Sequence, residues 1–116
     1  MSERPADCLF CRILDGTIPA DVVAETPHSV AFRDIDPKAP THVLVIPRRH
    51  VENVAELAQA SDEEVTDVIR LAARVAADEE LDGYRLVANT GADAHQTVFH
   101  AHLHVLGGRA MTWPPG

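Results

Sequence analysis

Three histidines near the C-terminal end are the feature that most constrains how this chain can fold. They alternate with apolar residues in the segment His100-Ala101-His102-Leu103-His104-Val105-Leu106. In a β-strand, alternate side chains point to opposite faces, so this spacing places three imidazoles on one face and the apolar residues in a core on the other. In a helix, the imidazoles would lie at about 0°, 200° and 40° around the axis, which separates His102 from the other two. The apolar, partly β-branched interleaving favours the strand.

Two helices are predicted from periodicity and capping residues. A short helix is expected over residues 8–14, with Asp7 as its N-cap and Gly16 at its end. A long helix is expected from Ser61, which opens a capping box with Glu64, to about Leu81. Its predicted buried stripe consists of apolar residues at helical spacing, namely Val65, Val68, Ile69, Ala72, Val75 and Ala76.

Four further segments are predicted strands, at 21–25, 30–34, 43–46 and 84–89. The turn at 26–29 is short enough for a hairpin, and 43–46 is a continuous apolar run typical of a central strand. A short helical turn is expected within 51–58. The order predicts one domain over residues 1–116, an α+β fold with a five-stranded, mostly antiparallel sheet, one long helix and one short helix.

Charge and composition exclude several classes of function. The net charge of −8 argues against non-specific binding to nucleic acid or to an anionic membrane, both of which need a basic surface. No apolar run is long enough to span a membrane, and the polar residues 2–7 precede no apolar segment of a signal peptide. The two cysteines suggest reduced thiols or metal ligands rather than a disulfide framework. We therefore expect a cytoplasmic protein.

The three imidazoles predict chemistry rather than a structural role, because ionisable groups crowded on one face resist being protonated together. The alternative is a half-exposed strand whose histidines are ordinary polar residues, or a chance tract with affinity for metals. A neutral imidazole is a good nucleophile near pH 7. Flanking histidines can orient it, bind an anionic phosphate or pass a proton to a leaving group, so the segment predicts covalent catalysis.

The pair Cys8-x-x-Cys11 is ambiguous by itself, since it fits a redox pair, half of a zinc site or two buried core residues. No thioredoxin-like βαβ pattern surrounds the pair, which makes the redox function the weakest of the three. Zinc would need two further ligands, and the chain offers histidines for them.

The segment 100–106 resembles the motif His-φ-His-φ-His-φ-φ, with φ apolar, of the histidine triad (HIT) superfamily. Residues 34–50 resemble the central loop and strand of that family. Gly107-Gly108-Arg109 and Trp113-Pro114-Pro115-Gly116 resemble the ending of its histidine triad nucleotide-binding (Hint) branch. The resemblance covers nearly the whole chain. It implies the HIT fold, a purine nucleotide substrate and a homodimer in which the tail with Trp113 reaches toward the partner's active site.

The resemblance also implies roles for individual residues. His102 matches the nucleophile, which attacks the α-phosphorus of a nucleoside phosphoramidate or a similar ester and gives a nucleotidyl-histidine that water hydrolyses. His104 would contact phosphate and leaving group, and the carbonyl of His100 would orient His102. Asp34 matches the carboxylate that binds the ribose hydroxyls. The other matches are polar residues around the phosphate, Asn89, Gln96 and Thr97, and apolar walls of the base pocket, Phe10, Ile13, Phe32 and Ile35.

Members of the superfamily that carry an N-terminal CxxC bind a structural zinc, and the resemblance extends this site to the present chain. The remaining two ligands match His50 and His100. The implied site is a closed tetrahedral centre of Cys8, Cys11, His50 and His100. No organic cofactor is implied.

Two departures from the Hint pattern and two other functions complete the expectations. Ala94 and His95 stand where that branch often has glycines beside the phosphate, and Arg33 stands where it can have a histidine near the base. The same residues also fit a hydrolase of dinucleoside polyphosphates. They fit, in addition, a non-catalytic scaffold that binds nucleotide or zinc and works through partners.

Overall fold

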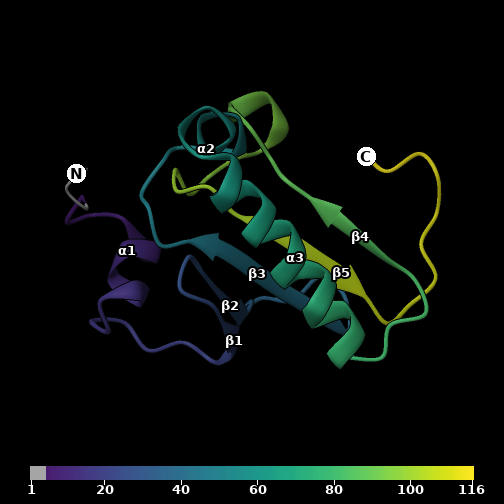
Figure 1. Ribbon diagram of the computed structural model, residues 1–116. Helices are drawn as coiled ribbons and strands as arrows, with labels where there is room; N and C mark the ends of the chain where they lie inside the picture. Colours follow the sequence, from purple (N-terminus) through teal and green to yellow (C-terminus); the bar gives the residue numbers. More distant parts are fainter. Residues whose placement is uncertain (1–4) are drawn as a thin grey trace.

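The structure is a computed structural model that describes residues 5–116 (Figure 1). Residues 1–4, which carry part of the polar N-terminal segment, lie outside the described residues. The helices and strands, in chain order, are α1 Leu9–Leu14, β1 Val22–Glu25, β2 Ser29–Arg33, β3 Thr41–Pro47, α2 Val54–Ala60, α3 Asp62–Asp78, β4 Tyr84–Val87 and β5 Leu103–Gly107. A single 3₁₀ turn, Ala92–Ala94, lies in the loop between β4 and β5.

The five strands form one antiparallel sheet in the order β1-β2-β3-β5-β4. This confirms the predicted α+β class and the predicted five-stranded sheet. β3 is the central strand and is buried along both faces, as its continuous apolar run predicts. β5 lies between β3 and β4, so the strand that carries His104 is an interior strand of the sheet.

The two faces of the sheet carry different layers. α3 crosses one face, where Val43, Val45 and Val105 pack with its buried residues (Figure 1). On the opposite face, Leu44 packs in a second apolar cluster that includes Phe10 of α1. Leu44 pairs with His104, and paired residues of an antiparallel sheet share a face. The triad histidine of β5 therefore lies on the face that α3 leaves open.

α3 ends three residues before the predicted Leu81, at Asp78. Glu80 adopts the left-handed conformation with φ of 55°, and the Leu81 N–H donates to the Ala76 carbonyl at 3.0 Å. This is a Schellman ending, usually made by glycine. It forms here on a glutamate because the next side chain, Leu81, packs against the core.

Three other local predictions are corrected. Within α3, Leu71 is buried at 2% exposure while the predicted Ile69 is 44% exposed, because the buried face follows the spacing of Glu64, Val68, Leu71 and Val75. The N-cap of α1 is the Cys8 thiolate or thiol, which accepts from the Cys11 N–H, and not Asp7. The turn expected within 51–58 is a full helix, α2, so the fold has two short helices rather than one.

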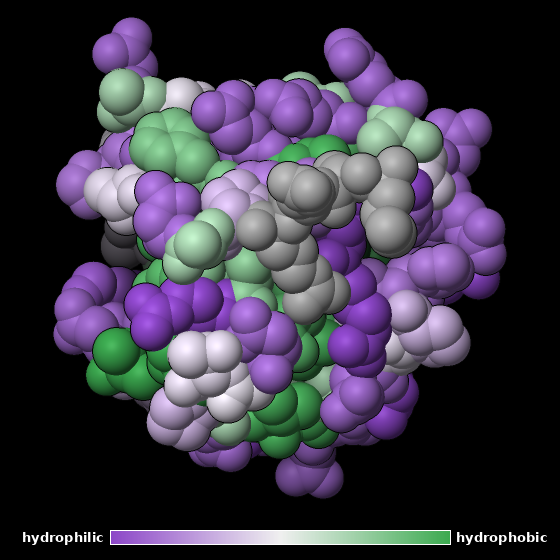
Figure 2. All heavy atoms as spheres, turned by 90° about the vertical axis from the view of Figure 1, so that its left-hand side faces the viewer, coloured by the Kyte–Doolittle hydropathy of each residue, from purple (hydrophilic) through white to green (hydrophobic). Residues whose placement is uncertain are grey.

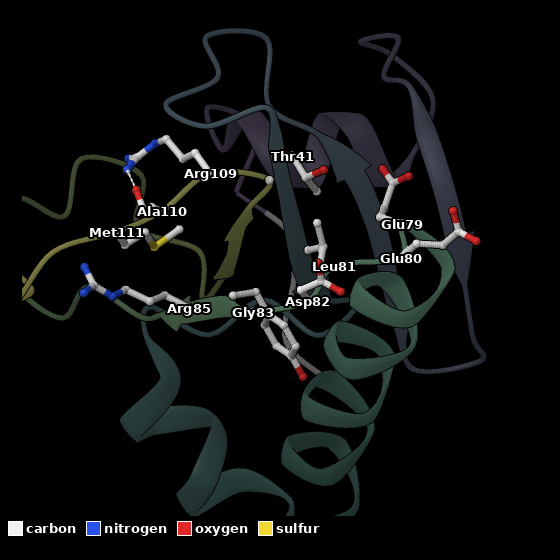
Figure 3. A pocket seen from close by; sticks show the side chains of 12 residues that line it. Thr41, Glu79, Glu80, Leu81, Asp82, Gly83, Arg85, Arg109, Ala110 and Met111 are labelled. Carbon is white, nitrogen blue, oxygen red and sulfur yellow. Dashed lines mark hydrogen bonds between the residues drawn. The ribbon is translucent and has the colours of Figure 1, made fainter.

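The surface shows no continuous apolar layer on the side that carries α1, where hydrophobic residues emerge between hydrophilic ones (Figure 2). Among the described residues, no helix is both long and apolar enough to cross a bilayer. A large open pocket of about 770 Å³ lies between the end of α3, the start of β4 and residues 108–111 (Figure 3). It contains no histidine and none of the predicted site residues, so the chemistry has to be sought elsewhere.

Candidate active site and metal centre

The histidines form a row of rings on the sheet face opposite α3. Neighbouring ring centroids are 5.0 Å apart for His50–His100, 5.0 Å for His102–His104 and 5.1 Å for His104–His42. These contacts join His102, His104 and His42 in one group and His50 with His100 in another, and His100 and His102 precede the strand, which begins at Leu103. The preceding residues leave the ladder because the Ala101 N–H donates to the carbonyl of Val51, at 2.8 Å, instead of to a neighbouring strand.

His102 is held as a neutral imidazole with one bare nitrogen. Its Nδ1 lies 2.7 Å from the carbonyl oxygen of His100. A carbonyl only accepts, so Nδ1 carries the proton and the Nε2 lone pair is available. Burial lowers the pKa of His102, while the hydrogen bond to His100 and the carboxylate of Asp34 act in the opposite direction. The arrangement favours a ring that is unprotonated at Nε2 near neutral pH, which is the form that a nucleophile needs.

His104 is fixed in the opposite tautomer by a chain of hydrogen bonds. The Lys38 N–H donates to Nδ1 of His42 at 3.0 Å, so the proton of neutral His42 is on Nε2. That Nε2–H donates to Nδ1 of His104 at 2.9 Å, which puts the proton of His104 on its Nε2. Burial, followed by the neighbouring imidazoles of His102 and His42, lowers the pKa of His104 to about 4.

The Nε2–H of His104 has no hydrogen-bond partner among the described residues and is buried. A buried donor without a partner is costly, so the group is expected to meet an acceptor that a ligand brings. Since Nε2 of His104 belongs to the ring beside His102, that acceptor would lie next to the nucleophile. A phosphoryl oxygen has the required chemistry.

Asp34, His42 and His104 form a group whose donor atoms lie within 4.8 Å of one another, close enough to suggest a metal site. Asp34 Oδ2 is 3.5 Å from Nε2 of His42. That nitrogen carries a proton, because the Lys38 N–H occupies Nδ1 of the same ring. A protonated nitrogen has no lone pair for a metal, so the group is a hydrogen-bonded network that sets tautomers.

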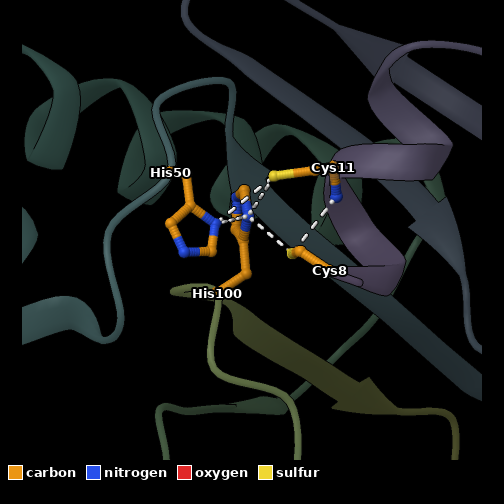
Figure 4. A group of neighbouring side chains, drawn as sticks. All are labelled: Cys8, Cys11, His50 and His100. Carbon is orange, nitrogen blue, oxygen red and sulfur yellow. Dashed lines mark hydrogen bonds between the residues drawn. The ribbon is translucent and has the colours of Figure 1, made fainter. Parts of the chain in front are cut away.

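Cys8, Cys11, His50 and His100 form a second group with donor atoms within 4.8 Å of one another (Figure 4). The two thiol sulfurs come from α1, His50 from the loop after β3 and His100 from the segment before β5. Nδ1 of His100 lies 3.1 Å from Nδ1 of His50, 3.5 Å from Sγ of Cys8 and 3.6 Å from Sγ of Cys11. Zinc bonds of about 2.0–2.3 Å in a tetrahedron produce ligand separations of this size.

The proton on His100 supports metal binding at this group. Its Nε2 lies 2.9 Å from the carbonyl oxygen of Pro47, so Nε2 carries a proton, and Nδ1 points its lone pair toward Cys8, Cys11 and His50. Metal-ligating histidines usually donate their second ring N–H to a carbonyl or carboxylate in this way. The residues present therefore fit a tetrahedral metal ion.

The apolar residues predicted to line the base pocket divide into buried and exposed ones. Phe10 and Phe32 are each 4% exposed and belong, with the partly buried Ile13, to the apolar cluster beside His102. Ile35 is 99% exposed and lies outside that cluster. Trp113 is 81% exposed in the tail that leaves the sheet at the far end of β5.

The polar residues predicted to lie around the phosphate differ in burial and in their contacts. Gln96 is buried, and its amide accepts from the Gly91 N–H and donates to the carbonyls of Glu52 and Val98. This geometry indicates that Gln96 braces the loop that precedes the histidines. Thr97 is exposed on the same loop, and Asn89 is half-buried just after β4.

The structure also places the three residues at which the chain departs from the Hint pattern, Ala94, His95 and Arg33. His95 ends the 3₁₀ turn in the left-handed conformation with φ of 64°, the conformation for which a glycine would be the usual residue. Arg33 pairs with Glu79 at 2.6 Å, so its charge is directed toward the end of α3.

Sequence reasoning placed no function on His42, which the structure joins to His104. The signal lay in the pairing of β3 with β5, where Leu44 faces His104 and His42 faces Leu106 on the same face. Such a register is not readable from one sequence, because it joins residues 62 positions apart.

Comparison with known proteins agrees with this architecture. Residues 15–111 match the family model of the HIT domain. An uncharacterized HIT-like protein of Synechococcus elongatus is 44% identical over 117 residues, which span 100% of both chains. The solved structure of a HIT family hydrolase from Legionella pneumophila is 47% identical, with a TM-score of 0.90 over 95% of this chain and 100% of that one. A histidine triad nucleotide-binding protein from Candida albicans is 31% identical, with a TM-score of 0.80 over 95% of this chain and 85% of that one. The chain therefore belongs to the HIT domain family and has its fold.

Proposed function

We propose that this protein is a nucleotide hydrolase that releases a nucleoside monophosphate from purine nucleoside phosphoramidates or related nucleotides. The observation that carries the proposal is the 2.7 Å contact of His102 Nδ1 with the His100 carbonyl, which leaves Nε2 bare beside a buried donor. In the first step, Nε2 forms a bond to the α-phosphorus, the bond to the leaving group breaks, and the leaving nitrogen or oxygen takes up a proton from solvent. In the second step, water attacks phosphorus and gives one proton to solvent while the P–Nε2 bond breaks, which restores neutral His102.

The neighbouring residues would stabilise the phosphorus centre through hydrogen bonds. In this proposal His104 Nε2–H donates to a phosphoryl oxygen, where negative charge increases in the transition state. Its neutral form suits a donor that keeps its proton, because His42 holds Nδ1 in the acceptor role. Asp34, half-buried beside His42, would accept from the ribose hydroxyls, and Thr97 and Asn89 would lie around the phosphate.

Nucleotide recognition is supported by the apolar cluster next to His102. Phe10, Ile13 and Phe32 would form the wall of a base pocket, and the exposed Ile35 would close over a bound base. The similarity to the Candida albicans histidine triad nucleotide-binding protein supports a nucleotide ligand. Together with the Gly107-Gly108-Arg109 and Trp113-Pro114-Pro115-Gly116 endings, it supports placement in the Hint branch.

The test is the release of AMP from adenosine 5′-phosphoramidate by the wild type and by His102→Ala. Loss of His102 should lower kcat by at least about 1,000-fold, since the nucleophile is removed. Brief reaction with labelled substrate followed by peptide mass spectrometry should place the nucleotidyl group on His102. Equal rates for wild type and variant would refute the enzyme and leave a binding scaffold. Preferential cleavage of diadenosine polyphosphates would reassign the substrate.

We also propose that Cys8, Cys11, His50 and His100 hold a structural zinc ion. When bound, the ion would supply a crosslink between α1, the β3 loop and the segment before β5. Two thiolate ligands suit a reducing compartment, which supports a cytoplasmic location. Elemental analysis of protein purified without added zinc should give about one equivalent per chain, and Cys8→Ser with Cys11→Ser should abolish it. Less than a tenth of an equivalent in the wild type would refute the site.

A homodimer is the third element of the proposal. β4 is an edge strand on which Tyr84 and Leu86 are 42% and 37% exposed, and Trp113 is exposed in the tail beyond β5. Pairing of exposed edges and burial of a tail aromatic are common in symmetric dimers. Sedimentation equilibrium should give twice the chain mass. A monomer at micromolar concentration would contradict the dimer.

A further inference from the structure

The ring of Phe10 lies between the candidate metal centre and the candidate nucleophile. Its centroid is 5.1 Å from that of His102, with an interplanar angle of 87°, and 5.9 Å from that of His100. Phe32 contacts the same ring at 5.6 Å, and Phe10 is only 4% exposed. Edge-to-face contacts of this kind have a preferred geometry, so Phe10 restricts the orientation of the His102 ring.

The position of Phe10 depends on α1, and α1 depends on its two cysteines. The helix has six residues, too few to be stable by itself. Within residues 5–116, no strand or other helix makes an extended backbone contact with it. Its attachments are side chains, namely Phe10 and its apolar neighbours in the cluster and the thiols of Cys8 and Cys11 at His50 and His100.

We propose that Phe10 is a positioning residue for His102, through which occupancy of the Cys8–Cys11–His50–His100 centre sets the rate of turnover. The inference rests on the proposed function and adds a dependence of that site on the metal. A metal at the centre fixes both ends of the first turn of α1 and so fixes the ring that lies between Cys8 and Cys11 in the sequence. Loss of the metal leaves α1 attached by its apolar side chains and by the weaker contacts of its thiols with His50 and His100.

The rate of turnover should depend on metal occupancy because the ring of His102 keeps some freedom of orientation. The hydrogen bond at Nδ1 holds one atom, and the ring can still tilt about that contact. Phe10, at 5.1 Å, and His104, at 5.0 Å, both contact the ring and limit this tilt. A misplacement of the attacking atom by about 1 Å can lower a rate by about 100-fold.

Phe10 is also a predicted wall of the base pocket, and the two roles are separable with a substrate that has no base. We would compare adenosine 5′-phosphoramidate with ribose 5′-phosphoramidate in the wild type and in Phe10→Leu. The matched control is Leu14→Ala, which removes another apolar side chain of α1 from the same cluster. Phe10→Leu should lower kcat for the base-free substrate by at least about tenfold with little change in KM. Leu14→Ala should stay within about threefold of the wild type.

A second measurement does not require activity. The Cε1–H proton of His102 reports its ring surroundings by NMR, and it can be followed in the zinc-loaded protein and after chelation. Chelation should shift or broaden this signal in the wild type and leave it unchanged in Phe10→Leu. The same comparison can be made with kcat, measured in the zinc-loaded and in the chelated form of each protein. Chelation should lower kcat less in Phe10→Leu than in the wild type, because the substitution and the chelation interrupt the same path.

Two results would overturn the inference. One is a base-free kcat for Phe10→Leu equal to that of the wild type. The other is an equal effect of chelation in both proteins, which would route the coupling through the His100 carbonyl. If no substrate is turned over at all, the proposed function fails, while the NMR cycle still decides whether Phe10 transmits metal occupancy to His102.

Discussion

At the scale of single residues, backbone groups determine the proton positions of this site. The carbonyls of Pro47 and His100 and the amide of Lys38 each contact one ring nitrogen of a different histidine. Each contact assigns a tautomer, because a carbonyl only accepts and an amide N–H only donates. The contacts of Lys38 with His42 and of His42 with His104 require neutral rings, and burial favours the neutral form of His102, so these three rings are oriented before any substrate is present.

The lowered pKa of His104 predicts a loss of stability in mild acid. The unfolded chain binds a proton at His104 near pH 6.5, whereas the folded protein does so only near pH 4. Between these values the unfolded state binds more protons, so stability falls as pH falls. After a discount for partial exposure, we expect the His104 part of the free energy of unfolding to fall by about 1 kcal/mol between pH 7 and pH 5.

The measurement is urea unfolding of the wild type and of His104→Gln at both pH values. Glutamine can still accept from His42 but does not titrate, so the variant should lose about 1 kcal/mol less than the wild type. An identical pH dependence in wild type and His104→Gln would contradict the explanation.

Individual residues also show where sequence reasoning reaches its limit. Alternation, a local property, predicts three imidazoles on one face of a strand; the structure brings His102 and His104 together, whereas only His104 lies in β5 and the His100 side chain lies beside His50. The contact of His42 with His104 depends on strand register and was not foreseen. The exposure of Ile35 and the bracing contacts of Gln96 depend on how loops lie on the sheet, which periodicity does not describe.

At the scale of elements, Arg49 and Glu64 connect the end of β3 to the first turn of α3. Arg49 donates to both carboxylate oxygens, with a shortest distance of 2.7 Å, and Glu64 is 9% exposed. The hydrogen bond to Arg49 is the main reason that the pKa of Glu64 is lowered. Ser61 caps the same turn by accepting from the Glu64 N–H, so only half of the predicted capping box forms.

Arg49→Ala should lower the free energy of unfolding by more than the loss of an exposed ion pair does, because it leaves a nearly buried carboxylate without its partner. The control is Arg74→Ala, which removes an exposed pair with Asp78 within α3 and should cost about 0.5 kcal/mol or less. Chemical unfolding at pH 7 measures both. Equal costs for the two variants would show that the Arg49 pair behaves as a surface pair.

The end of β5 makes a separate prediction at Gly108. Its φ is +92°, and a Cβ there would lie 2.9 Å from Cβ of Pro40. Gly108→Ala should therefore destabilise the protein by about 1–3 kcal/mol. Gly83→Ala is the comparison, since nothing lies within 4 Å of a Cβ at that position, and it should be close to neutral in the same thermal unfolding measurement.

Elements were predictable where the signal was local and strong. The continuous apolar run of β3 and the amphipathic pattern of α3 predicted a central strand and a long helix, and both are present. The ends were less predictable, because they depend on tertiary contacts. Glu80 takes a conformation suited to glycine once Leu81 is buried, and Cys8 caps α1 in place of Asp7.

At the scale of the whole molecule, the antiparallel topology brings three distant segments to one face. Residues 8–11, 34–50 and 100–104 meet on the side of the sheet that α3 leaves open. His100 belongs to both halves of this face, since its side chain lies in the metal group and its carbonyl contacts His102. The candidate metal centre and the candidate catalytic histidine are thus only two residues apart in the chain.

The neutrality of the histidine row has a kinetic consequence for an anionic ligand. A protein of net charge −8 repels a nucleotide at long range, and uncharged imidazoles at the site do not offset that field.

Raising the ionic strength from about 0.01 M to 0.15 M shortens the screening length from about 30 Å to about 8 Å. The association rate of a fluorescent purine monophosphate in stopped flow should therefore increase with salt, while that of the uncharged nucleoside stays constant. A rate that falls with salt would reveal a positive local field around the site. A rate that rises with salt makes capture of the nucleotide an encounter that salt assists, the reverse of what is expected for proteins that attract phosphates with basic surfaces.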